Sequence, residues 1–218
     1  METFGPATFG DLNAADYDET QDPGTTDQTV DFIYDLMGGK GHTLELAIGT
    51  GRVALPLAAR GIKVSGIEGS PDMVAKMRAK PGGDAIPTVI GDMADAEIEG
   101  TFDHAFLIFN TLFNLQSQED QVRCFKNVAT KLHKGGTFLI EAYVPSMDDI
   151  TNHQRVSTKS LTHDTVKLEA LMHDPVRQLF EMQRIFITKD GMKMVPLPMR
   201  YAYPVSYTHL TLPTILLV

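Results

Sequence analysis

Between residues 43 and 143, short continuous apolar runs alternate with runs that have helical spacing. The first apolar run contains Leu44, Leu46 and Ile48 and stops at the glycine turn Gly49-Thr50-Gly51. Apolar residues with helical spacing follow from Val53 to Ala58. Further strand-like runs occur at residues 62–67, 87–90, 102–109 and 137–143. Strands that alternate with helices at this spacing predict a parallel sheet covered by helices on both faces.

Local start and stop signals define the predicted helices. Thr29–Met37 has helical spacing and precedes two glycines. Ser70, followed by proline and aspartate, is a strong helix start. Ser117 begins another helix, which we expect to end at Gly135 and Gly136. Pro56 predicts a kink in the helix after the glycine turn, because proline removes one backbone hydrogen bond.

The pattern changes after Pro145. From about Arg155 to Tyr203, strand-like runs are separated by turn pairs, and Asp190-Gly191 is a hairpin signal. We therefore expect an antiparallel β meander in place of another strand-helix-strand unit. The predicted organisation is an N-terminal arm at residues 1–27, a cofactor-binding domain at 28–145, the meander at 146–204 and a tail at 205–218.

The tail carries its own signal. Val205 to Thr214 reads VSYTHLTLPT, which resembles a translated sequencing adapter. We therefore expect residues 205–218 to be a non-native scar and leave them out of the fold prediction. The alternative is an ordinary β-strand, which the apolar residues of this stretch also suit.

Composition excludes several classes of protein. The chain has 218 residues and a formal net charge of −9, whereas a nucleic-acid scaffold needs a basic face. No apolar run approaches the roughly 20 residues that span a bilayer, and the N-terminus lacks signal-peptide features. Cys124 is the single cysteine, so an internal disulfide and a cysteine-based zinc site are excluded. We expect a cytoplasmic protein.

Two kinds of ligand suit the glycine turn. Gly49, Gly51 and Ala54 satisfy the dinucleotide pattern G-x-G-x-x-A, which indicates NAD. Glu45 favours S-adenosylmethionine, which is cationic and carries no phosphate. A carboxylate about 5 Å from one pyrophosphate charge would cost about 3 kcal/mol at an effective dielectric of about 20, and would favour a cation equally. The alternative for Glu45 is a solvent-facing or local capping role.

Three motifs resemble those of class I S-adenosylmethionine-dependent methyltransferases. Residues 45–51, ELAIGTG, are similar to motif I, [DE]-x-G-x-G-x-G, with Ala47 in place of the first glycine. Residues 66–73, GIEGSPDM, are similar to the second motif, and residues 91–93, GDM, to the third. The resemblance covers about residues 17–204. It implies a Rossmann-like, doubly wound, mostly parallel sheet with S-adenosylmethionine as cofactor.

The resemblance, read with strand-end positions, gives a candidate donor site. Its residues are Tyr17, Glu45, Ala47, Gly49, Gly51, Arg52, Glu68, Gly69, Met73, Asp92, Met93, Phe109 and Asn110. Glu68 ends the second strand and is expected to accept hydrogen bonds from both ribose hydroxyls; a solvated carboxylate is the alternative. By resemblance, Asp92 accepts from the adenine amine, with a turn role as the alternative. A helix-start Arg52 would be explained by a ligand anion, and surface exposure explains it equally well.

The remaining candidates have a less definite role. Met73 and Met93 are expected on the adenine faces or in the core, and Gly69 is expected to let backbone approach the ribose or adenine. Tyr17 is expected near the methionine carboxylate. By resemblance, Phe109, Asn110 and Thr111 follow the fourth strand, where backbone groups meet the methionyl amine and the substrate pocket begins. Asn110, with the nearby Asn114, either orients a ligand or caps its loop.

No general base is assigned, because a histidine is more often structural or exposed than catalytic; His133 fits a helix C-terminus and His163 a turn. No metal site is predicted. The expected reaction is direct methyl transfer to a small-molecule acceptor, which needs positioning more than acid–base chemistry when the acceptor is a neutral amine. The segment FNTLFNL and the triplet GDM resemble those of amino-sugar N-methyltransferases. That family ends with two more strands, which would follow Pro204, so we expect a chain that is truncated at its C-terminus, without its final strands, whose parent is the active enzyme. The alternatives are an NAD-dependent oxidoreductase and a non-catalytic binding protein. No nucleic-acid or membrane partner is expected, and a homodimer is left open.

Overall fold

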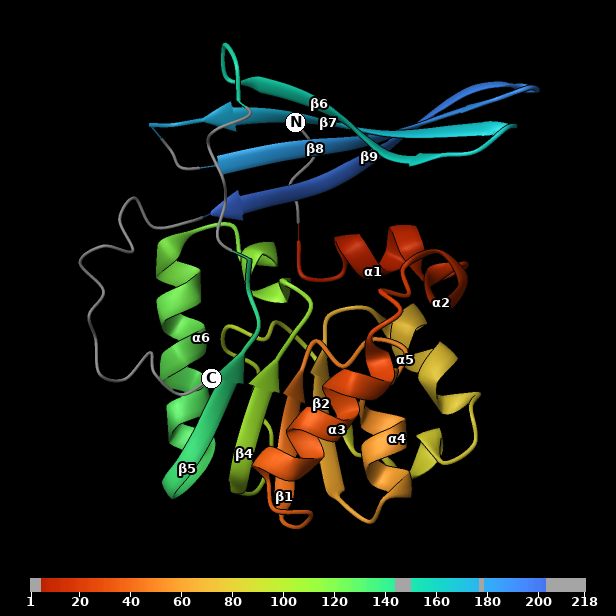
Figure 1. Cartoon of the computed structure of the whole chain (residues 1–218). Coiled ribbons are helices and arrows are strands. Elements are labelled where there is room, and N and C mark those ends of the chain that lie inside the picture. The colour runs from red at the N-terminus through yellow and green to blue at the C-terminus, as the bar shows by residue number, and fades with distance from the viewer. Residues whose placement is uncertain (1–4, 144–149, 177–178, 203–218) are drawn as a thin grey trace.

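The computed structural model describes residues 5–143, 150–176 and 179–202. Its larger sheet has five parallel strands in the order β3-β2-β1-β4-β5 (Figure 1). The strands are β1 (His42–Leu46), β2 (Lys63–Glu68), β3 (Thr88–Ile90), β4 (Phe102–Leu107) and β5 (Leu132–Ile140). The chain winds outward from β1 in one direction and then returns to add β4 on its other side. This is the predicted doubly wound topology, and β1 and β4 flank its switch point.

Helices cover both faces of this sheet. One hydrophobic cluster joins the sheet to α3 (Thr26–Leu36), α4 (Ala54–Ala59) and α5 (Pro71–Arg78). A second cluster joins the opposite face to α6 (Gln118–Lys131) through Cys124 and Val128. The alternation of strand and helix in the sequence therefore gave the correct layer order.

One local prediction was wrong. The helix that begins after Ser117 ends at Lys131, and β5 follows at once, so Gly135 and Gly136 lie inside a strand. The pairing of β4 with β5 shifts in this stretch, and a Cβ on Gly136 would come within 3.0 Å of the Asp103 carbonyl oxygen. Gly135 and Gly136 therefore lie where the pairing of β4 with β5 is irregular, and Gly136 leaves room for the Asp103 carbonyl. Pro56 is the third residue of α4, and the N–H groups of Leu55 and Leu57 donate to the carbonyls four residues earlier, so proline leaves one bond out of this series. The kink at Pro56 stays a prediction.

The second sheet is antiparallel, in the order β6-β7-β8-β9. Its strands are β6 (Gln154–Leu161), β7 (Thr165–Asp174), β8 (Leu179–Thr188) and β9 (Gly191–Ala202). Thr188 pairs with Gly191, so the predicted hairpin at Asp190-Gly191 is confirmed. Two elements after residue 203 were discussed from the sequence: the tail at 205–218 and the further strands beyond Pro204. Both lie outside the described residues.

The two faces of the antiparallel sheet differ. Its inner face contributes Leu171 and Phe180 to a cluster with Phe113, which lies in the short helix η2 (Thr111–Asn114) below the sheet. Its outer face is turned away from the parallel sheet (Figure 1). This face carries exposed apolar residues on all four strands. They include Val156, Leu161, Met172, Ile187, Met192 and Met194.

The N-terminal segment lies between the two sheets. Its helices α1 (Thr8–Asn13) and α2 (Tyr17–Thr20) contribute a layer above the ends of the parallel strands (Figure 1). Helix α1 packs closely against the start of α5, because a Cβ on Gly10 would lie 2.3 Å from the Ser70 Cβ. The Ser70 hydroxyl also donates to the Asp11 carboxylate over 2.7 Å. Within the described ranges, no helix combines the length and the apolar character that crossing a membrane requires.

Candidate functional site

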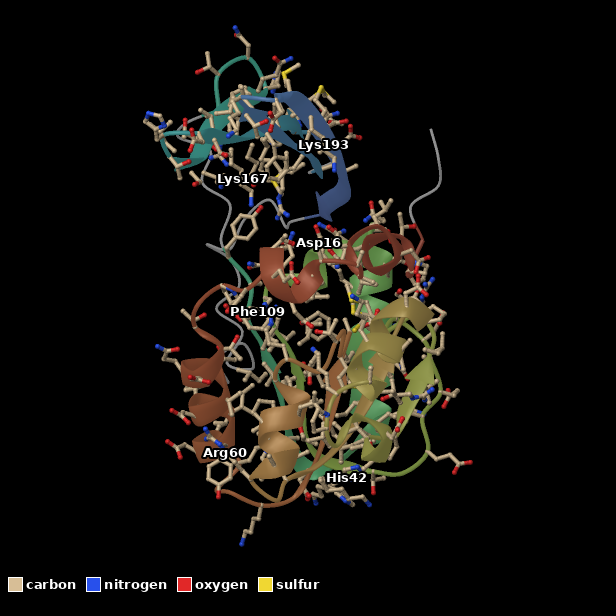
Figure 2. All side chains as sticks on the ribbon, turned by 90° about the vertical axis from the view of Figure 1, so that its right-hand side faces the viewer. Asp16, His42, Arg60, Phe109, Lys167 and Lys193 are labelled. Carbon is tan, nitrogen blue, oxygen red and sulfur yellow. The ribbon has the colours of Figure 1, made fainter. Side chains whose placement is uncertain are left out.

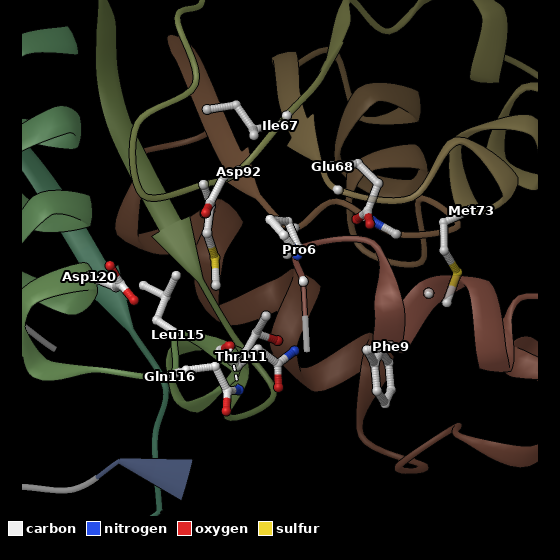
Figure 3. A pocket seen from close by; sticks show the side chains of 18 of the residues that line it. Pro6, Phe9, Ile67, Glu68, Met73, Asp92, Thr111, Leu115, Gln116 and Asp120 are labelled. Atoms are coloured by element: carbon white, nitrogen blue, oxygen red, sulfur yellow. Dashed lines mark hydrogen bonds between the residues drawn. The ribbon is translucent and has the colours of Figure 1, made fainter. Parts of the chain in front are cut away.

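The carboxyl ends of β1, β2 and β3 open into one cavity beneath the N-terminal segment (Figure 3). The centre of a water-sized molecule can occupy about 190 Å³ of this cavity. One buried water needs about 10–15 Å³ by the same measure, so the cavity has room for a much larger ligand. Its lining comprises Gly5, Pro6, Phe9, Gly10, Tyr17, Ala47, Gly49, Ile67, Glu68, Gly69, Met73, Gly91, Asp92, Met93, Thr111, Asn114, Leu115, Gln116 and Asp120.

The glycine turn after β1 forms part of the floor. Gly49 adopts φ +58°, and a Cβ added there would meet only the Ala47 carbonyl oxygen, 3.9 Å away. Ala47 itself has φ +52°, which is uncommon for a residue with a side chain. Gly51 has a different role, because its missing Cβ leaves room for the Met77 side chain. The turn therefore exposes bare backbone to the cavity at Gly49 and packs helix α5 at Gly51.

Glu68 ends β2 and faces the cavity (Figure 3). One carboxylate oxygen accepts from the Gly49 N–H at 2.8 Å, and the other accepts from the Ser70 N–H at 2.9 Å. Burial raises the pKa of Glu68, although these backbone N–H groups oppose the shift. Each oxygen retains a second lone pair for a ligand donor. A direct hydrogen bond therefore joins motif I, through Gly49, to the second motif, through Glu68.

Asp92 and the two predicted methionines also line the cavity. One Asp92 oxygen accepts from the Ala94 N–H at 2.8 Å, which fixes the carboxylate at the end of β3. Met73 is 2% exposed and Met93 is 8% exposed, so both belong to the packed interior as well as to the cavity wall. The core role and the ligand-facing role are thus compatible for these side chains.

Tyr17, Arg52 and Phe109 form a stack beside the cavity. The Arg52 guanidinium lies 4.3 Å from the Phe109 ring centroid and 5.2 Å from that of Tyr17. It donates to the Tyr17 hydroxyl at 3.1 Å and to the Gln21 carbonyl at 2.7 Å. Tyr17 lines the cavity, whereas Arg52 and Phe109 do not. Arg52 therefore holds Tyr17 in place, and surface exposure does not explain it.

Glu45 is buried behind the glycine turn and does not line the cavity. Burial raises the pKa of Glu45 well above its usual value, Arg52 opposes this, and Glu68 adds to it. One carboxylate oxygen of Glu45 and the Nε atom of Arg52 are buried with no hydrogen-bond partner among the described residues. The solvent-facing alternative for Glu45 is therefore wrong, and the cavity lining does not support a direct contact between Glu45 and the donor.

Asn110 and Gly69 have structural partners. Phe109 and Asn110 both have positive φ, and the Asn110 side chain accepts from the Tyr143 N–H at 2.6 Å. Asn110 lies outside the cavity lining, which supports its loop-capping alternative. A Cβ on Gly69 would lie 2.3 Å from the Pro6 carbonyl oxygen, so its small size admits the N-terminal backbone. The donor site predicted from the sequence therefore includes residues, such as Asn110, that support the cavity without lining it.

Sequence reasoning missed two parts of the lining. One is the N-terminal stretch from Gly5 to Gly10, which has no motif and whose apolar residues are few. The other runs from Leu115 to Asp120; just before it, Thr111 had been placed at the start of the substrate pocket and Asn114 had been considered for ligand contact. The alternation of apolar and polar residues in FNLQ was a usable signal for the second part.

The described histidines lie away from the cavity lining. His42 is at the opposite end of β1 from the glycine turn (Figure 2) and bonds with Ser65, while His104 bonds with Thr137. Burial raises the pKa of the Cys124 thiol to about 12, so this cysteine is protonated at neutral pH. Among the residues described, no three His, Cys, Asp or Glu side chains gather as metal ligands. The site therefore offers carboxylates, amides and backbone groups for binding.

A doubly wound sheet with a bare glycine turn and acidic strand ends defines an α/β cofactor-binding protein. The sequence pattern of the methyltransferase domain matches residues 43–136. The structure of the CcbJ methyltransferase from Streptomyces caelestis is 32% identical, with a TM-score of 0.82, and the match covers 92% of this chain and 83% of that one. The chain belongs to the class I S-adenosylmethionine-dependent methyltransferase family.

Two further relatives mark the range of similarity. The putative methyltransferase YqeM of Bacillus subtilis (strain 168) is 30% identical over 132 residues, which is 60% of this chain but only 53% of YqeM. The sugar N-methyltransferase KedS8 from Streptoalloteichus sp. ATCC 53650 has a TM-score of 0.61 at 17% identity, and the match covers 94% of this chain and 83% of KedS8. At that identity the likeness shows the fold alone.

Proposed function

We propose that this chain binds S-adenosylmethionine in the cavity and transfers its methyl group to a small-molecule acceptor by direct displacement. The observation that carries the proposal is the pair of carboxylates, Glu68 and Asp92, on a cavity floored by the bare backbone of Gly49. Lys and Arg are absent from the described lining, which suits a cationic donor and disfavours a pyrophosphate. Family membership and this charge pattern together argue against the NAD-dependent alternative.

The lining residues fit the parts of the donor. Glu68 has a lone pair free on each oxygen for a ribose hydroxyl, after the bonds to Gly49 and Ser70. Asp92 has one oxygen beyond the Ala94 bond for the adenine amine. Met73 and Met93 offer apolar walls for the adenine ring. The Tyr17 hydroxyl, held by Arg52, is the candidate for the methionine carboxylate.

Bound there, the donor supplies a methyl group on a positively charged sulfur. The chain contributes position and shielding from water. Glu68 and Asp92 fix one end, and the N-terminal segment with Phe9 covers the cavity. We assign no general base, because alignment of nucleophile and methyl carbon at about 3 Å accounts for most of the acceleration when the acceptor is a neutral amine.

A small acceptor is the class we propose. The antiparallel sheet roofs the carboxyl ends of the parallel strands and leaves a cavity of limited volume beneath it. KedS8 is titled a sugar N-methyltransferase and CalS10 from Micromonospora echinaspora an amino pentose methyltransferase, and both share the fold. We also propose a cytoplasmic location and the domain limits given from the sequence.

Calorimetry with S-adenosylhomocysteine and with NAD⁺ tests the binding step. We expect S-adenosylhomocysteine to bind with a micromolar or lower dissociation constant and NAD⁺ to give no heat. The reverse result would refute the proposal. Formation of S-adenosylhomocysteine over a panel of amines and alcohols tests catalysis, and binding without turnover would favour the non-catalytic alternative.

A further inference from the structure

The cavity wall from Thr111 to Asp120 is unusual in its hydrogen-bonding character. Asn114 and Gln116 both line the cavity, and each has a buried amide oxygen with no partner among the described residues. A buried acceptor without a partner costs about 1–3 kcal/mol, so its presence calls for an explanation. A ligand that donates to these oxygens supplies one.

The orientation of the Gln116 amide follows from its neighbour. The Gln116 Nε2 atom donates to the backbone carbonyl of Asn114 over 3.0 Å (Figure 3). A carbonyl oxygen only accepts, so the nitrogen of the amide faces Asn114 and Oε1 is the atom left unpaired. The free group that Gln116 offers is therefore an acceptor.

Packing on both sides holds this wall in place. Phe113 is 1% exposed and packs with Leu171 and Phe180 of the antiparallel sheet. Leu115 is 5% exposed and packs in the other direction, into the cluster that contains Met93. Alternate residues are therefore anchored in two hydrophobic clusters. Asn114 lies between these two anchors and Gln116 follows the second, so both amides are held at the cavity before any ligand arrives.

The other polar groups of the wall are also acceptors. The Thr111 hydroxyl already donates to the Ile108 carbonyl at 2.8 Å, which leaves its oxygen lone pairs. The Asp120 carboxylate forms an ion pair with Arg123 at 2.8 Å and lines the cavity. The unpaired acceptors of this wall favour a ligand with N–H or O–H groups over an apolar one.

The position of the wall separates it from the proposed donor contacts. Thr111 and Gln116 lie together on one side of the cavity, and Glu68 and Ile67 lie on the other (Figure 3). Helix η2, which ends at Asn114, packs against β9 of the antiparallel sheet. The unpaired amides therefore stand between the donor contacts and the roof.

We infer that Asn114 and Gln116 form a subsite for the methyl acceptor, and that the acceptor is an amine or alcohol with N–H or O–H groups directed at their amide oxygens. The inference rests on the proposed function and adds the class of acceptor and the residues that select it. It places the reacting molecule in the cavity, on the side of η2 that faces Glu68.

The test uses Gln116→Met, which keeps the length of the side chain and removes the amide, with Gln118→Met on the exposed start of α6 as the matched control. The ligands are S-adenosylhomocysteine, followed by calorimetry, and trans-4-aminocyclohexanol and cyclohexane-1,4-diol, followed by ligand-observed NMR on the S-adenosylhomocysteine complex. We expect Gln116→Met to weaken binding of at least one ring probe five- to tenfold, with S-adenosylhomocysteine affinity within twofold of wild type. The control should match wild type in both measurements.

Three results would overturn the inference. The wild-type complex could bind neither ring probe at millimolar concentration, or Gln116→Met could bind both as well as wild type. A tenfold loss of S-adenosylhomocysteine affinity in Gln116→Met would assign the amide to the donor instead. Failure of wild type to bind S-adenosylhomocysteine at all is a different outcome, which refutes the proposed function.

Discussion

Replacing Glu68 by alanine tests the donor site most directly. Its two oxygens hold the Gly49 and Ser70 amides, and the carboxylate faces the cavity. A hydrogen bond to a charged acceptor contributes about 1.5–3 kcal/mol. Loss of one ribose bond of this kind raises the dissociation constant of S-adenosylhomocysteine about 10-fold to about 150-fold.

The same replacement has a structural cost that must be separated from the binding loss. It leaves the Gly49 and Ser70 N–H groups without their acceptor, at about 1–3 kcal/mol each if water does not replace it. Because Glu68 lines the cavity, we expect water to enter and the free energy of unfolding to fall by about 1–2 kcal/mol. Urea unfolding measures this term, and calorimetry with S-adenosylhomocysteine measures the binding term.

Two variants serve as comparisons for Glu68→Ala. Glu68→Gln retains the side-chain volume and one acceptor, so its binding loss should be smaller. Glu99→Ala removes an exposed carboxylate away from the cavity and should bind like wild type. A folded Glu68→Ala protein with a dissociation constant within twofold of wild type would remove Glu68 from the donor site.

Three other perturbations test separate parts of the structure. Gly10→Ala places a Cβ against Ser70, so we expect several-fold weaker S-adenosylhomocysteine binding with a nearly unchanged thermal midpoint; equal affinity would contradict the tight seat of α1. Burial raises the pKa of Glu45, so its proton is held more tightly in the folded state, and stability is lost as pH rises above the usual 4.5. Thermal midpoints from pH 4.5 to 8 should therefore fall for wild type relative to Glu45→Gln, and parallel curves would refute this. If the exposed, apolar outer face pairs two copies of this acidic chain, Ile187→Lys should convert a dimer to a monomer in light scattering, whereas Val176→Lys should not; a monomeric wild type would refute the homodimer.

The sequence identified those parts of the fold that depend on local signals. A glycine turn follows β1, Glu68-Gly69 ends β2, and Gly91-Asp92 follows β3. Parallel strands bring their carboxyl ends to one edge of the sheet. Glu68, Asp92 and Gly49 were therefore predictable as neighbours. The hairpin at Asp190-Gly191 was predictable because this pair favours a tight turn.

Other features depend on contacts between distant segments. Gly136 resembles a helix stop, and only the close approach of the Asp103 carbonyl explains its place inside β5. Gly69 lies in a ligand-binding motif, yet its free space admits the backbone of Pro6. Arg52 looks exposed at a helix start, and the rings that enclose it come from residues 17 and 109. No local pattern encodes these partners.

The seating of residues 5–10 has a practical consequence for anyone who expresses this protein. The Pro6 carbonyl lies directly over Gly69, and Gly5 already forms part of the cavity wall. An affinity tag fused ahead of residue 1 would be joined four residues before Gly5. Titrations on such a fusion would report on the tag as well as the enzyme, so the tag should be cleaved before any affinity is recorded.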